Sequence, residues 1–401
     1  MARDVKHKPA LKAHLASANR IPYCASLYPL AHGGNNTALC IAHECARKIP
    51  RHGAQCVSLA ERSSRTLRTV TISAKERLVV LLRPTVSRPT HLAQAIEDLK
   101  RQHNAVILAH YYQLPEIQDM ADYIGDSLQL ARQAAETDAD TIVFCGVHFM
   151  AETAKILSPH KTVLLPDLEA GCSLATSAPA AEFRAFVEAH PDHTVVTYVN
   201  STAAVKAVSD YCVTSSNAVQ VVNSIPPEQP ILFAPDQYLG DWVREQTGRE
   251  NMLLWQGSCE VHEVFSEQRL MDLIAEHRQA QVLVHPECPR HIRQHAHVVG
   301  STKALLDAVR QGDPHGTFIV VTEPGIIHQM RQAAPQATFL EAPGIRSQAG
   351  SCTSCNECPH MKRNTLEKLW LCLEHQKPAI HLAPEVVERA RLPIERMLSI
   401  G

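Results

Sequence analysis

The chain contains 401 residues, of which 45% are apolar and 20% are charged, and its net charge at pH 7 is −2. This length suits two or three domains. The proportions of apolar and charged residues are typical of a globular protein rather than a disordered, collagen-like or coiled-coil chain. The longest apolar runs have about five residues, whereas a membrane helix needs about 18, so we expect no membrane span. The 13 cysteines are an odd number without a signal-peptide pattern, which favours reduced thiols or metal ligands in the cytoplasm.

Residues 1–88 differ from the rest in charge, with 15 Lys and Arg against 4 Asp and Glu. They show no sustained helical or strand period, so we expect a basic, irregular extension that is disordered or non-native. A transit peptide and sequence read through from an upstream start both fit this composition. Four cysteines in the extension fit no zinc-knuckle spacing: Cys24, Cys40, Cys45 and Cys56. The extension lacks interleaved aromatic residues and a recognisable module, so we expect no nucleic-acid partner.

Beyond residue 88 the chain repeats itself. Three apolar strands are predicted at residues 105–110, 194–198 and 281–285. Each ends in a polar residue, and the spacings are 88 and 87 residues: His110, Tyr198 and His285. Three predicted helix starts keep the same two spacings: Ser127, Ser215 and Thr302. A second strand follows at 141–144, 230–233 and 317–321. Two landmarks with one period indicate three homologous units.

Each unit reads strand, loop, helix, strand, helix, which predicts an α/β fold with parallel strands covered by helices. We place the units at residues 89–173, 174–261 and 262–350, followed by a cysteine-containing loop and helical tail at 351–401. Three like units pack most economically around a pseudo-threefold axis. Ligands gather at the carboxyl ends of parallel strands, so the polar landmarks should face one central site.

Cysteines near the ends of the units suggest a metal centre. Cys172 and Cys259 are 87 residues apart, on the period of the repeat, and a third group follows slightly late at Cys352, Cys355 and Cys358. One thiolate from each unit could meet on the axis. Three cysteines suit a [4Fe–4S] cluster with one iron left free to act as a Lewis acid.

Other interpretations of the cysteines are weaker. A ferredoxin stretch would place a cysteine at position 362, which is a lysine, and a zinc ribbon would need a second Cys-x2-Cys pair. The remaining cysteines lie in apolar or helical contexts and are interpreted as packing residues: Cys145, Cys212, Cys288 and Cys372.

Many ordered motifs from about residue 89 to the end resemble the quinolinate synthase A family. They are AHYYQ (109–113), GDSLQLA (125–131), AETAK (151–155), LLPD (164–167), YVN (198–200), VTSSNA (213–218), HPE (285–287), GST (300–302) and NECPHM (356–361). The resemblance implies a three-domain α/β enzyme, a transferase of NAD biosynthesis, with a central [4Fe–4S] cluster. It implies condensation of iminosuccinate with dihydroxyacetone phosphate to quinolinate, phosphate and water, and a functional link to L-aspartate oxidase or aspartate dehydrogenase.

The resemblance also assigns residues. It implies Cys172, Cys259 and Cys358 as cluster ligands, which leaves Cys352 and Cys355 as a potential thiol–disulfide pair. The implied substrate-binding positions are His110, Ser127, Tyr198, Val199, Asn200, Ser215, His285, Pro286, Glu287 and Thr302. Ring formation requires several proton transfers, for which Glu287 is the expected general base, with Tyr112 and His285 relaying or donating protons.

Three rival functions follow from the same residues. A [4Fe–4S] hydratase or dehydratase acting on a small hydroxy acid would use the same three thiols. An electron-transfer or iron–sulfur storage protein would want four protein ligands. A zinc-dependent binding module would contain zinc rather than iron and sulfide.

Overall fold

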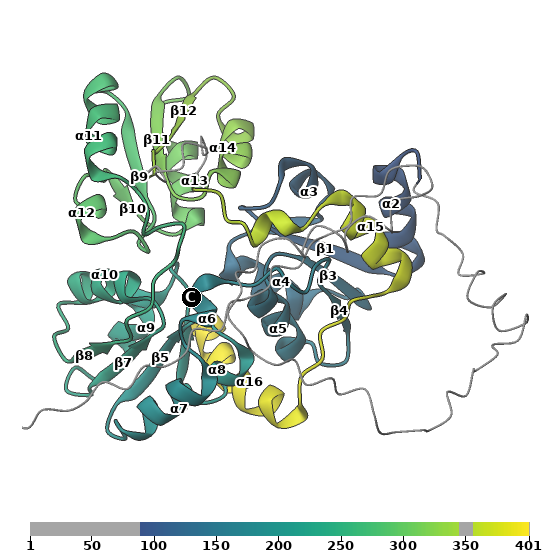
Figure 1. The fold of residues 1–401 in the computed structure, drawn as a ribbon, viewed down its shortest axis with the longest axis horizontal. Helices are drawn as coiled ribbons and strands as arrows, with labels where there is room; N and C mark the ends of the chain where they lie inside the picture. The colour runs from purple at the N-terminus through teal and green to yellow at the C-terminus, as the bar shows by residue number, and fades with distance from the viewer. Residues whose placement is uncertain (1–88, 345–355, 401) are drawn as a thin grey trace, which may run out of the picture. The chain divides into compact units, whose positions relative to one another are not determined.

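A computed structural model describes residues 89–344 and 356–400 of the chain. The predictions made for residues 1–88 and for Cys352 and Cys355 concern residues outside these ranges. The described part contains three separate four-stranded sheets, and every strand pair in them is parallel (Figure 1). The predicted α/β class with three parallel-sheet units is confirmed.

The first sheet has the strand order β2-β1-β3-β4. Its strands are β1 (Ala105–His110), β2 (Tyr123–Gly125), β3 (Thr141–Cys145) and β4 (Thr162–Leu164). Its helices are α2 (Leu92–Gln102), α3 (Pro115–Met120), α4 (Ser127–Glu136) and α5 (His148–Leu157). The central strands β1 and β3 are apolar and almost entirely buried, as strands covered on both faces must be.

The second sheet repeats this order as β6-β5-β7-β8. Its strands are β5 (Thr194–Tyr198), β6 (Tyr211–Val213), β7 (Ile231–Ala234) and β8 (Met252–Leu254). The helices in this stretch are α6 (Ser173–Thr176), α7 (Ala180–Glu188), α8 (Ala203–Lys206), α9 (Ala218–Ser224) and α10 (Gln237–Thr247).

The third sheet has the equivalent order β10-β9-β11-β12. Its strands are β9 (Gln281–Val284), β10 (Val298–Val299), β11 (Thr317–Val321) and β12 (Thr338–Glu341). The helices are α11 (Glu267–Glu276), α12 (Arg290–Arg293), α13 (Thr302–Gln311), the 3₁₀-helix η2 (Pro324–Ile326) and α14 (Ile327–Ala333).

The sequence predicted two strands in each unit, and the structure has four. The additional strands lie at the sheet edges and are two to four residues long, which is too short for a period to emerge from the sequence. In each unit the first strand in the sequence occupies the same interior position of its sheet. The three units therefore share one strand order, as the sequence repeat implies.

The C-terminal segment joins the units to one another. It contains the 3₁₀-helix η3 (Met361–Arg363), α15 (Leu366–His375) and α16 (Pro384–Ile400). Helix α15 packs on α2 of the first unit, whereas α16 packs on β6 and α8 of the second unit and on α5 of the first. Figure 1 shows both helices in yellow.

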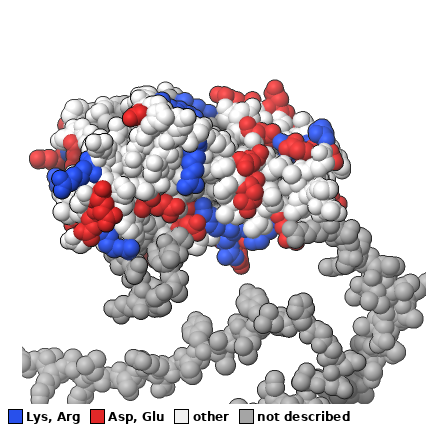
Figure 2. Space-filling model, turned by 90° about the horizontal axis from the view of Figure 1, so that it is seen from above, with Lys and Arg blue, Asp and Glu red and all other residues white. Residues whose placement is uncertain are grey.

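Buried side chains of all three sheets belong to one continuous apolar cluster, which includes Leu108, Phe233 and Phe318. Four cysteines expected to be packing residues are fully or almost fully buried: Cys145, Cys212, Cys288 and Cys372. On the face seen in Figure 2, acidic and basic side chains are interspersed. Within residues 89–344 and 356–400, no helix is long and apolar enough to cross a membrane.

Candidate active site

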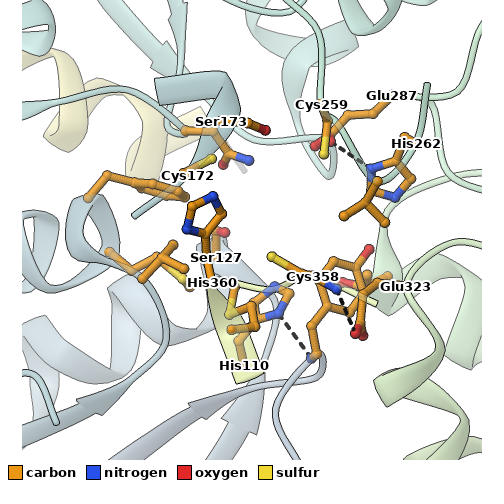
Figure 3. A pocket seen from close by; sticks show the side chains of 18 of the residues that line it. His110, Ser127, Cys172, Ser173, Cys259, His262, Glu287, Glu323, Cys358 and His360 are labelled. Carbon is orange, nitrogen blue, oxygen red and sulfur yellow. Dashed lines mark hydrogen bonds and ion pairs between the residues drawn. The ribbon is translucent and has the colours of Figure 1, made fainter. Parts of the chain in front are cut away.

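Strand ends and helix starts of all three units line one pocket with an empty volume of about 710 Å³, part of which is open to solvent (Figure 3). His110 is the last residue of β1, Tyr198 is the last residue of β5, and His285 follows β9 directly. Since parallel strands present their carboxyl ends at one edge, the repeat brings these three residues to the same cavity. All three line it, as the sequence predicted.

His110 and His285 share the same local geometry. Nδ1 of His110 accepts a hydrogen bond from the backbone N–H of Tyr112 at 3.2 Å, and Nδ1 of His285 accepts one from the N–H of Glu287 at 3.4 Å. Burial is the main reason that the pKa of each imidazole falls to about 3. Both rings are therefore neutral at pH 7 and carry their proton on Nε2, where it can be donated to a substrate oxygen.

The hydroxyl residues at the predicted helix starts also line the pocket, and where these helices have a capping side chain it belongs to the preceding residue. Asp126 caps α4 by accepting from the N–H groups of Leu128 and Gln129, and Ser301 caps α13 by accepting from the N–H of Ala304. Ser127 and Thr302 are the first helical residues. The reason is geometric, because the capping side chain belongs to the non-helical residue just before the helix.

Ser215 differs from the other two because α9 begins only at Ala218. Each of the other two helix starts comes two residues after a glycine that packs closely against the first turn. A Cβ on Gly300 would lie 2.7 Å from Cβ of Ala304, and one on Gly125 would lie 2.9 Å from Cβ of Gln129. The second unit has Val213 at the equivalent place. The expected set of three helix starts is therefore reduced to two.

The hydroxyls of all three residues are available to a ligand. The hydroxyls of Ser127, Ser215 and Thr302 make no hydrogen bond to any other residue in the described part of the chain, and all three residues line the pocket. Asn200 also lines it, and its Oδ1 is buried without a partner among the described residues. A buried polar atom is normally satisfied, so the free Oδ1 of Asn200 indicates a place where a ligand donates a hydrogen bond.

Two residues assigned to substrate binding lie elsewhere. Val199 lines a small adjoining cavity, with an empty volume of about 190 Å³, rather than the main pocket. Pro286 is not among the described residues that line either cavity.

Three cysteines point their sulfur atoms toward the same open space (Figure 3). One lies in the loop before α6, one after β8 and one before η3. They are Cys172, Cys259 and Cys358, and none forms a disulfide with another described residue. Burial raises the pKa of Cys172 to about 12 and that of Cys358 to about 11, and it raises the pKa of Cys259 well above its ordinary value. Without a cation these thiols stay protonated, and a bound metal would hold them as thiolates.

A chain of hydrogen-bonding groups runs along one wall of the pocket. The Tyr112 hydroxyl lies 2.6 Å from Oγ1 of Thr322, which lies 2.9 Å from Nε2 of His262. Nδ1 of His262 lies 2.9 Å from Oε2 of Glu287, and the Tyr198 hydroxyl donates to Oε1 of Glu287 at 2.6 Å. The chain brings together residues of all three units.

The hydrogen-bonding groups along this wall of the pocket differ in their protonation states. Burial opposes ionisation of Glu287, but the attraction of His262 and His285 and the hydrogen bond from Tyr198 outweigh it, so the pKa of Glu287 falls below its ordinary value. Burial is also the main cause that raises the pKa of Tyr112 and of Tyr198 well above the ordinary value. Glu287 is therefore a carboxylate, and both tyrosines retain their protons.

The sequence analysis did not select His262 or Thr322. His262 lies three residues after Cys259, and cysteine and histidine are both common metal ligands. The three ligand atoms of Cys259, His262 and Glu287 lie within 4.8 Å of one another, so these residues alone could hold a metal ion. Thr322 directly follows the apolar strand β11, and strand ends are the expected places for functional residues.

Comparison with known proteins identifies the family. The family model described as "Quinolinate synthetase A protein" matches residues 94–399. A quinolinate synthase of Thermosynechococcus vestitus is 58% identical over 321 residues, which cover 80% of this chain and 99% of the relative. One of Synechococcus sp. is 58% identical over 319 residues, covering 80% and 98%. One of Prochlorococcus marinus is 57% identical over 317 residues, covering 79% and 93%. The chain therefore belongs to the quinolinate synthetase A family.

Proposed function

We propose that the protein is a quinolinate synthase that condenses iminosuccinate with dihydroxyacetone phosphate to quinolinate, phosphate and water. One observation carries the proposal: each of the three units contributes a free hydroxyl and a strand-end residue to one pocket, and the first unit, the second unit and the C-terminal segment contribute one thiol each. The reaction is a group transfer followed by ring closure. An enzyme that oxidises aspartate, such as L-aspartate oxidase or aspartate dehydrogenase, would supply the imine, and we propose a cytoplasmic location for the pathway.

The donor set fits a [4Fe–4S] cluster. Three thiols line the pocket, and no fourth cysteine of residues 89–344 and 356–400 does so. Three cysteine ligands leave one iron of such a cluster without a protein ligand. Cys172, Cys259 and Cys358 would hold the cluster. When bound, it would supply a Lewis acid that polarises a hydroxyl or carboxylate oxygen of the substrate.

Anion recognition in this pocket relies on neutral donors. Both proposed substrates are anions, yet no lysine or arginine of the described chain lines the pocket. The hydroxyls of Ser127, Ser215 and Thr302 and the Nε2–H groups of His110 and His285 can each donate one hydrogen bond. Hydrogen bonds to a charged acceptor are stronger than those between neutral groups, so several fixed donors can replace one cation.

The hydrogen-bonding groups along the pocket wall provide a route for proton transfer. Tyr112 faces the pocket with its proton retained, so it can donate to an oxygen that departs as water. Thr322 and His262 can return the proton to it. Glu287, the residue expected to act as general base, has both carboxylate oxygens engaged. We therefore assign Glu287 the role of stabilising positive charge on His262 while His262 exchanges the proton.

The hydratase alternative uses the same thiols, and an assay separates the two. Protein reconstituted anaerobically with iron and sulfide should contain about four irons per chain and form quinolinate from the two proposed substrates. Cluster-loaded protein that forms no quinolinate but dehydrates a small hydroxy acid would support the alternative. Zinc in place of iron and sulfide would contradict both.

A variant series tests the ligand assignment. Cys172→Ser, Cys259→Ser and Cys358→Ser should each lose iron and activity. Cys372→Ser is the matched control, because Cys372 is buried in the core between α15 and the first sheet and does not line the pocket. Retention of iron by Cys358→Ser, with loss of iron in Cys352→Ser or Cys355→Ser, would contradict the assignment.

A further inference from the structure

A buried ion pair connects the loop of Cys358 to the third unit. Glu323 follows Thr322 at the end of β11, and its side chain is completely buried. Its Oε1 lies 2.7 Å from Nζ of Lys362, which belongs to η3, four residues beyond Cys358. Taking two charges out of water is costly, and such a pair persists only where its geometry is well satisfied.

Both members of the pair make further contacts with backbone groups. Oε1 of Glu323 accepts from the N–H of Cys358 at 3.3 Å, and Oε2 accepts from the N–H of Gly325 at 2.7 Å. Nζ of Lys362 donates to the carbonyl oxygen of Tyr112 at 2.7 Å. The pair therefore connects the backbone of a cluster-ligand loop to the backbone of Tyr112.

Tyr112 is held at two points from the end of β11. Its hydroxyl lies 2.6 Å from Oγ1 of Thr322, and its carbonyl is held through Lys362 by Glu323, the next residue. The backbones also pack directly, because a Cβ on Gly325 would lie 2.9 Å from Cα and from the carbonyl carbon of Tyr112. The main chain of Tyr112 has little room to move while these contacts last.

We propose that Glu323 and Lys362 are positioning residues that couple the Cys358 loop to Tyr112. The loop that supplies the third thiol thereby also sets the position of the tyrosine that donates the proton. Neither residue performs chemistry in this scheme: Glu323 lines the pocket, but its carboxylate is held by Lys362 and by two backbone N–H groups, and Lys362 does not line the pocket. The inference rests on the proposed function for the role of Tyr112 and on the contacts above for the coupling.

Lys362→Met removes both the ion pair and the bond to the Tyr112 carbonyl. A displacement of about 1 Å in a catalytic group can cost about 10²-fold in rate, so we expect kcat to fall by up to about a hundredfold while KM and iron content stay unchanged. The double variant Glu323→Gln, Lys362→Met leaves no unpaired buried charge. We expect it to fold as the native protein does and to show the same loss in kcat.

Combination with Tyr112→Phe distinguishes positioning from general damage. If Lys362 acts through the tyrosine, adding Lys362→Met to Tyr112→Phe should cause little further loss in kcat, because the group being positioned is already absent. Losses that multiply would overturn the proposal. Loss of iron together with activity in Lys362→Met would also overturn it, because the pair would then serve only the cluster loop.

Hydrogen exchange of the anaerobic holoenzyme provides a readout independent of turnover. The amides of Tyr111, Tyr112 and Gln113 are hydrogen-bonded, so the peptide that contains them should be protected. Its exchange should accelerate in Lys362→Met. The control is Lys368→Met, which removes a lysine that reaches from the same C-terminal segment to Asp167 at 2.7 Å and does not contact Tyr112.

The two readouts keep the hypotheses separate. Equal exchange in native protein and in Lys362→Met would overturn the coupling, whatever the activity. Native protein that forms no quinolinate would contradict the proposed function, and exchange would still decide whether the pair holds the Tyr112 segment.

Discussion

Adjacent residues at the start of α13 should have opposite phenotypes, since Ser301 caps the helix and Thr302 presents a free hydroxyl to the pocket. Ser301→Ala removes a cap whose Oγ accepts from the N–H of Ala304 at 3.3 Å. Caps contribute about 0.5–2 kcal/mol, and this bond is long, so we expect a loss of about 0.5–1 kcal/mol in unfolding free energy. For a chain of this size that corresponds to about 2 °C in Tm. Turnover should be unchanged.

Thr302→Val keeps the branched shape of the side chain and removes only the hydroxyl. That hydroxyl bonds to no other described residue, so its loss leaves no group unsatisfied and Tm should not fall. A hydrogen bond to a charged ligand is worth about 1.5–3 kcal/mol, which converts to a fall of roughly ten- to a hundredfold in kcat/KM. Thr302→Ser retains the hydroxyl and should keep most of the activity.

The assays are calorimetry, iron determination and anaerobic measurement of quinolinate formation on all three variants. Iron content should match that of the native protein throughout, because neither residue belongs to the proposed ligand set. Native kinetics with a lowered Tm in Thr302→Val, or impaired turnover with native Tm in Ser301→Ala, would refute the assignment of the two roles.

Two further predictions concern other parts of the molecule. The pKa of His285 falls to about 3 in the folded protein, against an ordinary value of 6.5. Between these pH values the unfolded state therefore binds one more proton at this residue than the folded state does. The unfolding free energy should consequently fall as pH drops from about 6.5 toward 3. Denaturant titration of His285→Gln should show a weaker slope over that window, and an unchanged slope would mean that His285 is not buried as a neutral ring. A chain that begins near His91 should retain iron binding and turnover, since the family match begins at residue 94, and loss of either would show that residues 1–88 take part in the enzyme.

Local patterns in the sequence determined much of the fold. The apolar strands and their 88- and 87-residue spacings indicated three like units, because the period of a repeat survives in the sequence when the units themselves remain similar. The same spacings located His110, Tyr198 and His285, since the carboxyl end of a parallel strand has a predictable place in its sheet. The sequence did not predict the edge strands, because a strand of two to four residues is too short to show a period.

Other features depended on contacts between distant residues. Tyr112 meets Thr322, 210 positions later, and Lys362 meets the Tyr112 carbonyl 250 positions earlier. No local pattern encodes such contacts, because packing of the units against each other creates them. The choice of cap was local but could not be decided without coordinates, since Ser301 and Thr302 are both suitable capping residues. The sequence by itself therefore determined the units and the chemical groups at their strand ends, whereas the tertiary structure decided which of these groups face a ligand and which hold the others in place.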